Sequence, residues 1–524
     1  MVTPTEMAAI DAEAPEPIDE LIERAGWATA RAVLELLDQP YGSRVVILAG
    51  KGNNGADGRA AVPHLRRAGV HCRIVDVGGE SSASDAAGEE ASTGPATARR
   101  RAERPALIVD ACYGTGLRRP FDARTLPIEI GDTPVLAVDV PSGVDGATGE
   151  LRDHPLRATA TVTFAALKPG LVLEPGRSFV GRLTVADIGL DCSRATIHHL
   201  EADDLRRWPA RPVDGHKWRR AVAVVGGGPG MTGATGLAAL GALRAGAGYA
   251  TISRPGSALG AIPGVGAGPG PSGRVGAGSV GAASVGAGPV GAGSIDTGSV
   301  GAGSVETGSV GAGSVDAGPI EAVAYPVGER WADELADRLG RFGAAVVGPG
   351  LADQASNHRE VGRWWSEAPI PTVFDAGALT ALAAIGPPWP PPGAAHVLTP
   401  HEGELTRLLG RPPGTDRIAE ARSLAARLGA VVLLKGPTTV VADPGGEVLV
   451  STAGDARLAT AGTGDVLSGI VAAGLAAGLT PLLAAGLGAE VHGRSARRGH
   501  AVGLVASDLP ALVADLLSEV GTGG

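Results

Sequence analysis

The chain has 524 residues, of which 44% are hydrophobic, only 3% are aromatic and 82 are Gly, and its formal net charge is −10. This length exceeds what one hydrophobic core usually organises, so we expect two domains. The acidic net charge argues against non-specific binding to nucleic acid or anionic lipid, because such binding needs clustered Lys and Arg. The three Cys are widely spaced, so we expect neither a disulfide framework nor a zinc site. The N-terminus has no apolar signal region, and no apolar run of about 18 residues follows. We therefore expect a cytoplasmic protein without a membrane span.

The first 200 residues alternate helical patterns with short β-rich runs. Apolar residues at helical spacing predict an amphipathic helix over 18–37. Strands are expected at 44–49, 71–77, 107–111, 134–140, 160–165 and 182–188. This alternation predicts an α/β fold with a Rossmann-like, doubly wound parallel sheet that carries helices on both faces.

A glycine-rich run, GKGNNGADG from Gly50 to Gly58, follows the first expected strand. Glycines let the backbone approach a ligand, and the N–H groups at a helix start favour phosphate. The run also satisfies GxGxxG, and Asp76 follows about 20 residues later, as an ordinary dinucleotide-binding dehydrogenase would require. A tight turn without a ligand is a third interpretation.

Three further strands end in polar loops, which begin at Asp110 (DACYGTGL), Asp139 (DVPSGVD) and Thr163 (TFAALKPG). Ligands of open α/β sheets bind beyond the carboxyl ends of the strands, so we expect these loops to converge on one crevice. Any single Asp here could merely cap a loop, but four such motifs in succession indicate a binding site.

In the order and content of these loops, residues 1–200 resemble the NAD(P)H-hydrate epimerase family, which carries GNNGGDG, VDA-FGTG, VD-PSG-D and TF-KPG motifs. The resemblance implies that Asn54, Asp110 and Ser142 hold a potassium ion, and oxygen ligands suit such a hard cation. It implies that the hydrated dinucleotide contacts Asp139 and also Asn53, Asn54, Gly55, Ala56, Asp57, Gly114, Thr115, Gly116, Leu117, Arg118, Arg119 and Pro120.

Epimerising the carbon that bears the added hydroxyl requires ring opening or the loss and return of water. A carboxylate that exchanges protons is therefore needed, and Asp139 is the candidate. Two positions depart from the family pattern: Ala56 stands where Gly is usual, and Ala8 where Arg commonly follows the early Met. If Ala56 had to adopt a positive φ, the loop would be strained and epimerase activity weakened.

A polar, Pro-containing stretch at 203–217 separates this unit from a second one, so we place the domains at 1–203 and 204–524. The second unit repeats the α/β rhythm, with helices expected after Gly464 and after Pro481. Its strands are expected at 221–225, 249–253, 344–347, 372–374, 396–398 and 431–434.

Residues 256–320 form a low-complexity insert in which Val or Ile recurs every five residues among Gly, Ala, Ser and Pro. A period of five fits neither strand nor helix. Such sparse apolar content cannot offset a backbone ordering cost of roughly 1 to 2 kcal/mol per residue, so we predict a disordered insertion in a surface loop. A stacked pentapeptide solenoid is the alternative.

The segment 461–469 (AGTGDVLSG) carries the clearest chemistry of the second unit. A Gly-rich turn that opens an apolar helix directs its N–H groups and the positive end of the helix dipole to one point, as an anion hole for a transferring phosphoryl group does. Asp465 could take a proton from the attacking hydroxyl, although an N-terminal helix acid is the simpler interpretation. Lys435 follows four apolar residues, which places it at a strand end, with a surface Lys as the alternative.

Together with GPGL at 348–351, TPHEGE at 399–404 and KGPTT at 435–439, this turn resembles the ADP/ATP-dependent NAD(P)H-hydrate dehydratase family, a branch of the ribokinase-like fold. The resemblance implies phosphorylation of the hydroxyl of the hydrated NADH or NADPH by ADP with Mg²⁺, followed by expulsion of phosphate, in a homo-oligomer. Asp465 would be the base. The substrate would contact Ala234, Gly350, His401 and Asp465, and the nucleotide would contact Lys435, Gly436, Pro437, Thr438, Thr439 and Gly464.

Three other functions were weighed against a bifunctional repair enzyme. A ribokinase-like vitamin kinase shares the GTGD turn but leaves the first unit unexplained. A dehydrogenase explains both GxGxxG strings, at 50–55 and 228–233, but not Lys435 or the GTGD turn. The first unit could also be a non-catalytic ligand-binding or scaffolding module.

Overall fold

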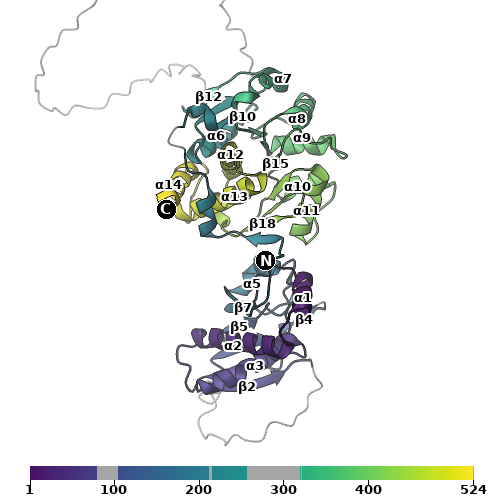
Figure 1. The fold of residues 1–524 in the computed structure, drawn as a ribbon, viewed down its shortest axis with the longest axis vertical. Coiled ribbons are helices and arrows are strands. Elements are labelled where there is room, and N and C mark those ends of the chain that lie inside the picture. Colours follow the sequence, from purple (N-terminus) through teal and green to yellow (C-terminus); the bar gives the residue numbers. More distant parts are fainter. Residues whose placement is uncertain (79–103, 118, 212–214, 257–318, 320, 523–524) are drawn as a thin grey trace, which may run out of the picture.

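The computed structural model describes residues 1–78, 104–117, 119–211, 215–256, 319 and 321–522. These residues form two lobes stacked along the long axis of the molecule and joined at a narrow waist (Figure 1). The insert predicted to be disordered spans residues 256–320, which lie outside the described residues apart from Gly256 and Pro319. Within the described part, no helix has the length and apolar character needed to cross a membrane.

The lobe that contains most of the first 200 residues is built on a six-stranded sheet in which every pairing is parallel. All six strands were predicted from the sequence. In spatial order they are β2 (His71–Asp76), β1 (Arg44–Ala49), β3 (Leu107–Ala111), β5 (Val135–Val138), β7 (Ala160–Phe164) and β8 (Arg182–Ala186).

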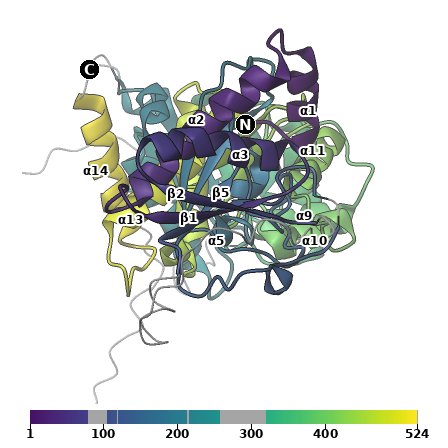
Figure 2. The same cartoon turned by 90° about the horizontal axis from the view of Figure 1, so that it is seen from below.

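Alternate residues of β1 enter different clusters on the two faces of this sheet. Val45 and Ile47 pack beneath α2 (Ile18–Leu36) and α3 (Asn53–Arg67), which lie together on one side of the sheet (Figure 2). Val46 and Leu48 pack on the opposite side against the loop residues 112–130. The predicted amphipathic helix is therefore confirmed as α2, which covers one face of the sheet.

A ten-stranded sheet forms the centre of the other lobe and is parallel except at the β16–β17–β18 meander, whose two pairings are antiparallel. The six strands predicted here are confirmed, whereas the meander strands β17 and β18 and the edge strands β9 and β12 were not predicted. In order they are β12 (Val323–Ala324), β11 (Tyr249–Ser253), β10 (Ala221–Val225), β13 (Ala344–Val347), β14 (Thr372–Phe374), β15 (Val397–Leu398), β16 (Val431–Leu434), β17 (Thr439–Ala442), β18 (Val448–Ser451) and β9 (Ile197–His199).

Helices cover both faces of this second sheet, because alternate residues of β10 enter two separate cores. Val222 and Val224 pack with α6 (Thr232–Arg244), α12 (Thr463–Ala476), α13 (Pro481–Arg498) and α14 (Leu509–Thr522). Ala223 and Val225 face the opposite core, whose helices are α7 (Trp331–Ala336), α8 (Ala355–Glu367), α9 (Gly377–Ile385), α10 (Glu402–Leu409) and α11 (Arg417–Leu428).

Two elements near the waist were not expected from the sequence. Strand β9 pairs with β18, so the second sheet takes up a strand that precedes the boundary predicted at residue 203. Helix α1 (Pro4–Glu13) begins with a capping box in which the Thr3 hydroxyl and the Glu6 carboxylate each accept a backbone N–H. The short helix α5 (Arg177–Val180) lies at the waist, close to β18 in Figure 1.

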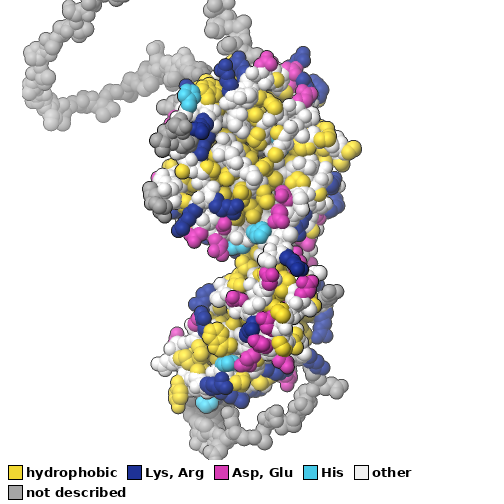
Figure 3. Space-filling model, viewed as in Figure 1, with side chains coloured by type: hydrophobic (Ala, Val, Ile, Leu, Met, Phe, Trp, Pro, Cys, Tyr) yellow, Lys and Arg dark blue, Asp and Glu magenta, His cyan; other side chains and the backbone are white. Residues whose placement is uncertain are grey.

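Charged side chains are spread over both lobes in Figure 3, with Lys and Arg interspersed among Asp and Glu on the visible face. That face shows no extended surface of one sign. This distribution fits the sequence-based expectation that the protein does not bind nucleic acid or anionic lipid non-specifically.

Candidate active sites

A cavity of about 450 Å³ lies at the carboxyl ends of β1, β3, β5 and β7, where the sequence motifs were expected to converge. Helices α1 and α2 close its other side. Residues of all four loops line it, including Asn54, Asp57, Asp139 and Lys168. Of the residues expected at the substrate, Asn53 and 114–117 also line this cavity.

Asp139 and Lys168 form the main ion pair of this cavity. The Lys168 Nζ lies 2.7 Å from Asp139 Oδ1 and also donates to the Thr163 hydroxyl and to the Phe164 carbonyl. Lys168 is only 1% exposed, so the charge of this pair is almost fully shielded from water. Asp139 has φ +65°, a strained conformation for a non-glycine residue of the kind that clusters at functional sites.

Two further carboxyls share the cavity with this pair. Burial and the nearby Asp139 and Asp11 raise the pKa of Asp57 to about 8. Burial likewise raises the pKa of Asp11, which Lys168 partly offsets. At neutral pH, Asp57 therefore retains its proton next to Asp139, which pairs with Lys168.

Two of the three residues predicted to bind potassium, Asp110 and Ser142, are hydrogen-bonded to each other and fully buried. Asp110 is fully buried and accepts hydrogen bonds from the Ser142 hydroxyl at 2.6 Å and from the Ser142 and Cys112 amides. Burial raises the pKa of Asp110. Both polar side-chain atoms of Asn54 are buried without a hydrogen-bond partner in the described structure, and a Cβ on Gly114 would lie 3.2 Å from Asn54 Oδ1.

Gly50 and Gly55 of the first loop lie so close to neighbouring backbone that a side chain would not fit. A Cβ on Gly50 would lie 1.9 Å from the Cys112 carbonyl oxygen, and one on Gly55 would lie 2.0 Å from the Gly50 carbonyl oxygen. Ala56 lies inside α3, where its N–H donates to the Gly52 carbonyl, so the strain considered for this position does not arise. Asp76, the alternative ribose reader, instead pairs with Arg59.

Two residues of the second loop that were expected at the substrate are not part of the lining of this cavity. Arg119 and Pro120 are exposed and do not line it, and Arg119 donates to the Tyr113 hydroxyl. Arg118 lies outside the described residues. Whether these three residues contact the substrate stays a prediction.

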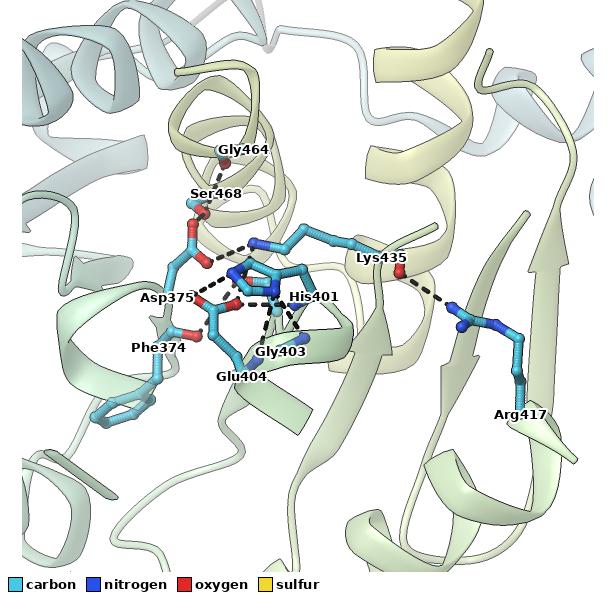
Figure 4. A network of polar contacts seen from close by, with 10 residues as sticks. Phe374, Asp375, His401, Gly403, Glu404, Arg417, Lys435, Gly464 and Ser468 are labelled. Atoms are coloured by element: carbon cyan, nitrogen blue, oxygen red, sulfur yellow. Dashed lines mark hydrogen bonds and ion pairs between the residues drawn. The ribbon is translucent and has the colours of Figure 1, made fainter. Parts of the chain in front are cut away.

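In the second lobe, Lys435 lies at the end of β16 and joins a buried network (Figure 4). Its Nζ is 2.8 Å from Asp375 Oδ1 and 3.7 Å from Glu404 Oε2. The other oxygen of Asp375 accepts the Ser468 hydroxyl at 2.6 Å. Burial alone would lower the pKa of Lys435, but Asp375 and Glu404 together raise it, so the ammonium form is kept.

The GTGD turn opens helix α12 as the sequence predicts. Gly462 is the N-cap with φ +89°, a conformation that glycine adopts without strain, and Thr463 is the first helical residue. A Cβ on Gly464 would lie 3.5 Å from Lys435 Nζ, so the first turn of the helix meets the buried ammonium. Burial and the neighbouring Asp375 raise the pKa of Asp465 to about 7, which Lys435 partly opposes.

The other residues expected at the second site flank this network. His401 caps α10 by accepting the N–H groups of Gly403 and Glu404, and its ring is 56% exposed. Gly350 has φ +64°, and a Cβ there would lie 3.3 Å from Cβ of Ala234. These two positions are therefore neighbours although they are far apart in the sequence.

Loop 435–439 connects β16 to β17, and Arg417 holds it through a hydrogen bond to the Lys435 carbonyl. A second cavity of about 360 Å³ is bordered by Asp455, Arg457 and Thr460, which lead into the GTGD turn. The Thr460 carbonyl accepts the Thr463 hydroxyl, so the wall of this cavity continues into the start of α12.

Sequence reasoning missed three charged residues of these sites. Asp375 follows β14 directly, a position at a strand end that could have indicated a functional residue. Glu404 was recognised only as part of the TPHEGE motif. Asp11 lies on the unpredicted helix α1, so no sequence signal connected it with the cavity.

Two family models match the chain. One, described as NAD(P)H-hydrate dehydratase, matches residues 286–517, and the other, described as YjeF-related protein N-terminus, matches residues 18–170.

Curated relatives match along nearly the whole chain. A bifunctional NAD(P)H-hydrate repair enzyme of Moorella thermoacetica is 33% identical over 567 aligned positions, which cover 100% of this chain and 98% of that protein. An enzyme of the same description from Salinibacter ruber is 31% identical, and the match covers 96% of this chain and 92% of that protein. Another from Mycobacterium tuberculosis is 32% identical, and the match covers 88% of this chain and 86% of that protein. Among solved structures, an ADP/ATP-dependent NAD(P)H-hydrate dehydratase from Bacillus subtilis, co-crystallised with ATP and Mg²⁺, is 24% identical with a TM-score of 0.45 and covers 62% of this chain and 98% of that one.

Proposed function

The chain belongs to the family of bifunctional NAD(P)H-hydrate repair enzymes, and from this membership we propose which of its residues carry out each reaction. The enzyme has epimerase and dehydratase activity on hydrated NADH and NADPH. We assign epimerisation to the domain at 1–203 and dehydration to the domain at 204–524. The cavity around Asp139 serves the first reaction, and the network around Lys435 serves the second.

In the epimerase site, Asp139 is the group that exchanges protons with the hydrated ring. Lys168 pairs with it at 2.7 Å, whereas Asp57, with its pKa of about 8, keeps a proton at neutral pH. Two carboxyls with different protonation states can supply the base and the acid that epimerisation needs. Asn53, Asn54 and residues 114–117 line the same cavity and would hold the dinucleotide.

We further propose that Asn54, Asp110 and Ser142 hold a potassium ion. Among the described residues, the fully buried Asp110 carboxyl accepts hydrogen bonds only from neutral groups, and the amide oxygen of Asn54 is buried without a partner. A bound cation would satisfy both needs. The ion would supply positive charge beside the substrate-binding loops. The proposed proton transfer does not depend on it.

In the dehydratase site, Asp465 takes the proton of the substrate hydroxyl while the terminal phosphoryl group of ADP is transferred to the hydroxyl oxygen. AMP leaves, and phosphate is then expelled to restore the dihydronicotinamide. The first-turn amides of α12 stabilise the migrating group, and Lys435 neutralises its charge. The observation that carries this proposal is the approach of Lys435 to Gly464, next to an Asp465 whose pKa is about 7.

The charges around Lys435 favour a magnesium ion at this site. Asp375, Glu404 and Asp465 place three carboxyls around one ammonium, a charge excess that favours a divalent cation. Among the described residues, no group of three metal-ligating side chains is arranged to hold an ion alone, so nucleotide phosphates would have to supply further ligands. The ion would neutralise phosphate charge.

The nucleotide would lie against loop 435–439 and Gly464, and the hydrated ring against Ala234, Gly350 and His401. We also propose a cytoplasmic location, which the three free thiols of the described chain support, and a homo-oligomeric assembly as in our sequence prediction.

The stoichiometry of the reaction tests the proposed function. We expect one AMP and one phosphate for each NADH restored when the hydrate and ADP are incubated with the enzyme. A vitamin kinase would instead retain the phosphoryl group on a stable product and release no phosphate, a result that would overturn the dehydratase assignment.

A further inference from the structure

Loop 435–439 of the dehydratase domain is held partly by the epimerase domain. The Thr438 hydroxyl donates to the Val172 carbonyl at 2.5 Å. The Arg177 guanidinium donates to the Pro437 carbonyl and to the Thr438 hydroxyl, both at 3.4 Å. These contacts lie at the waist, where α5 approaches β18 in Figure 1.

Arg177 also connects this loop to the segment that follows β18. Its other terminal nitrogen donates to the Thr452 carbonyl at 3.3 Å. Thr452 follows β18 and precedes Asp455, which borders the cavity of about 360 Å³. One side chain therefore joins two loops that are separate within the dehydratase domain.

The dehydratase domain alone fixes only part of this arrangement. Its own Arg417 holds the beginning of the loop through the Lys435 carbonyl, and Arg497 holds the Thr452 carbonyl at 2.8 Å. Among the described side chains, Arg177 is the one that donates hydrogen bonds to both the Pro437 carbonyl and the Thr452 carbonyl.

The contact between the domains is also well packed. Val172 and Leu173 are buried in the same core cluster as the strands β14 and β16 of the second sheet. Thr438 is only 2% exposed. Arg177 is half-buried beside them, and its hydrogen bond to the Pro437 carbonyl lies at the exposed edge of this contact.

We propose that Arg177, a residue of the epimerase domain, is a positioning residue for the nucleotide site of the dehydratase domain. This inference rests on the proposed role of loop 435–439 in binding ADP. Arg177 orders the loop and the Thr452 segment before the nucleotide arrives, so binding does not have to supply that ordering. It does not touch the reacting atoms, so its loss weakens nucleotide binding and leaves the chemical step intact.

The test compares Arg177→Ala with the wild type in the full-length chain, with the hydrate saturating and ADP varied. We expect the KM for ADP to rise about tenfold, equivalent to ~1.4 kcal/mol, with kcat changed less than about twofold. The dissociation constant of ADP, measured by titration calorimetry, should rise by the same factor. Arg177→Lys should recover part of the affinity, because a single ammonium cannot replace a planar guanidinium that reaches several acceptors.

Arg182→Ala is the matched control, since Arg182 is an exposed arginine on β8 of the same domain. It should leave the KM for ADP unchanged. The inference is overturned if Arg177→Ala leaves that KM within about twofold of the wild type, if kcat alone falls, or if the control shows the same rise. If the wild type itself shows no dependence on ADP or ATP, the proposed function fails as well, so the two failures are distinguishable.

Discussion

Lys435 and Asp375 form a buried ion pair at 2.8 Å that links the ends of two strands to the first turn of a helix. Lys435 ends β16, Asp375 follows β14, and Ser468 of α12 donates to the second oxygen of Asp375. The pair therefore fixes the distance between the ammonium and the GTGD turn that opens α12. Because preorganised charge in a site shielded from water is a large term in catalysis, this geometry should control the rate of dehydration.

Replacing Asp375 by Asn tests the importance of that geometry. The amide keeps the size of the side chain but removes the charge that orients Lys435, so we expect kcat for dehydration to fall about 10² to 10³-fold. Epimerisation, which we assign to the other lobe, should be unchanged. Ser468→Ala serves as the milder control, with a loss of about tenfold at most, because it removes one neutral donor. Activity near the wild-type level in Asp375→Asn would show that the pair is only structural.

The pH dependence of dehydration should report on Asp465. Its pKa of about 7 is high for a carboxyl, and only the ionised form can accept the hydroxyl proton. The rate should therefore fall as the pH is lowered through about 7. Asp375 contributes to raising this pKa, so in Asp375→Asn the acid limb should move to lower pH. A limb that stays in place would exclude this electrostatic coupling. The measurement is kcat/KM for the hydrate against pH, because this ratio reports the ionisation of the enzyme before the hydrate binds.

Asp139→Asn should separate the two activities in the opposite direction. We expect epimerisation to slow by about 10² to 10⁴-fold, the usual contribution of a general acid or base. Dehydration of the pure S epimer should continue at the wild-type rate. Chromatographic separation of the two epimers over time, without ADP, gives the first rate. Unchanged interconversion would mean that another group of the cavity exchanges the proton.

Asp57 should make the epimerase domain less stable at alkaline pH. Its pKa rises from the ordinary 3.8 to about 8 in the fold, so the native state holds a proton that the unfolded state has lost. This stabilisation is fully present below 3.8 and disappears as the pH rises through about 8, at ~1.4 kcal/mol per pH unit in between.

Asp57→Asn removes that dependence. The variant should therefore unfold at a higher temperature than the wild type near pH 9, by calorimetry, and the advantage should shrink as the pH is lowered towards about 4. Equal pH dependence in the two proteins would show that Asp57 is ionised in the native state.

The sequence predicted most of the two sheets because most of their strands are short, apolar runs that are buried on both faces, although the edge strands β2 and β8 are largely exposed. It did not predict β17 and β18, which belong to an antiparallel meander beside a sheet that is otherwise parallel. Helix α1 was missed because its apolar residues form no clear stripe, and only Met7 is buried.

The candidate sites divide in the same way. Residues within motifs, such as Asp139, Lys435 and Asp465, could be singled out because each follows a strand or opens a helix. Asp375 and Asp11 carry no motif, and they enter the sites only through packing between elements distant in the sequence. The contact of Arg177 with loop 435–439 depends on how the domains meet, which no local pattern contains.

Asp465→Ala tests the central claim most directly. The variant and the wild type are incubated with ADP and each epimer of hydrated NADH, and the absorbance of restored dihydronicotinamide is followed while the epimers are separated by chromatography. We predict that restoration from the S epimer stops in the variant, whereas interconversion of the epimers continues at the wild-type rate. Restoration at an undiminished rate in Asp465→Ala would contradict the assignment of this carboxylate as the base.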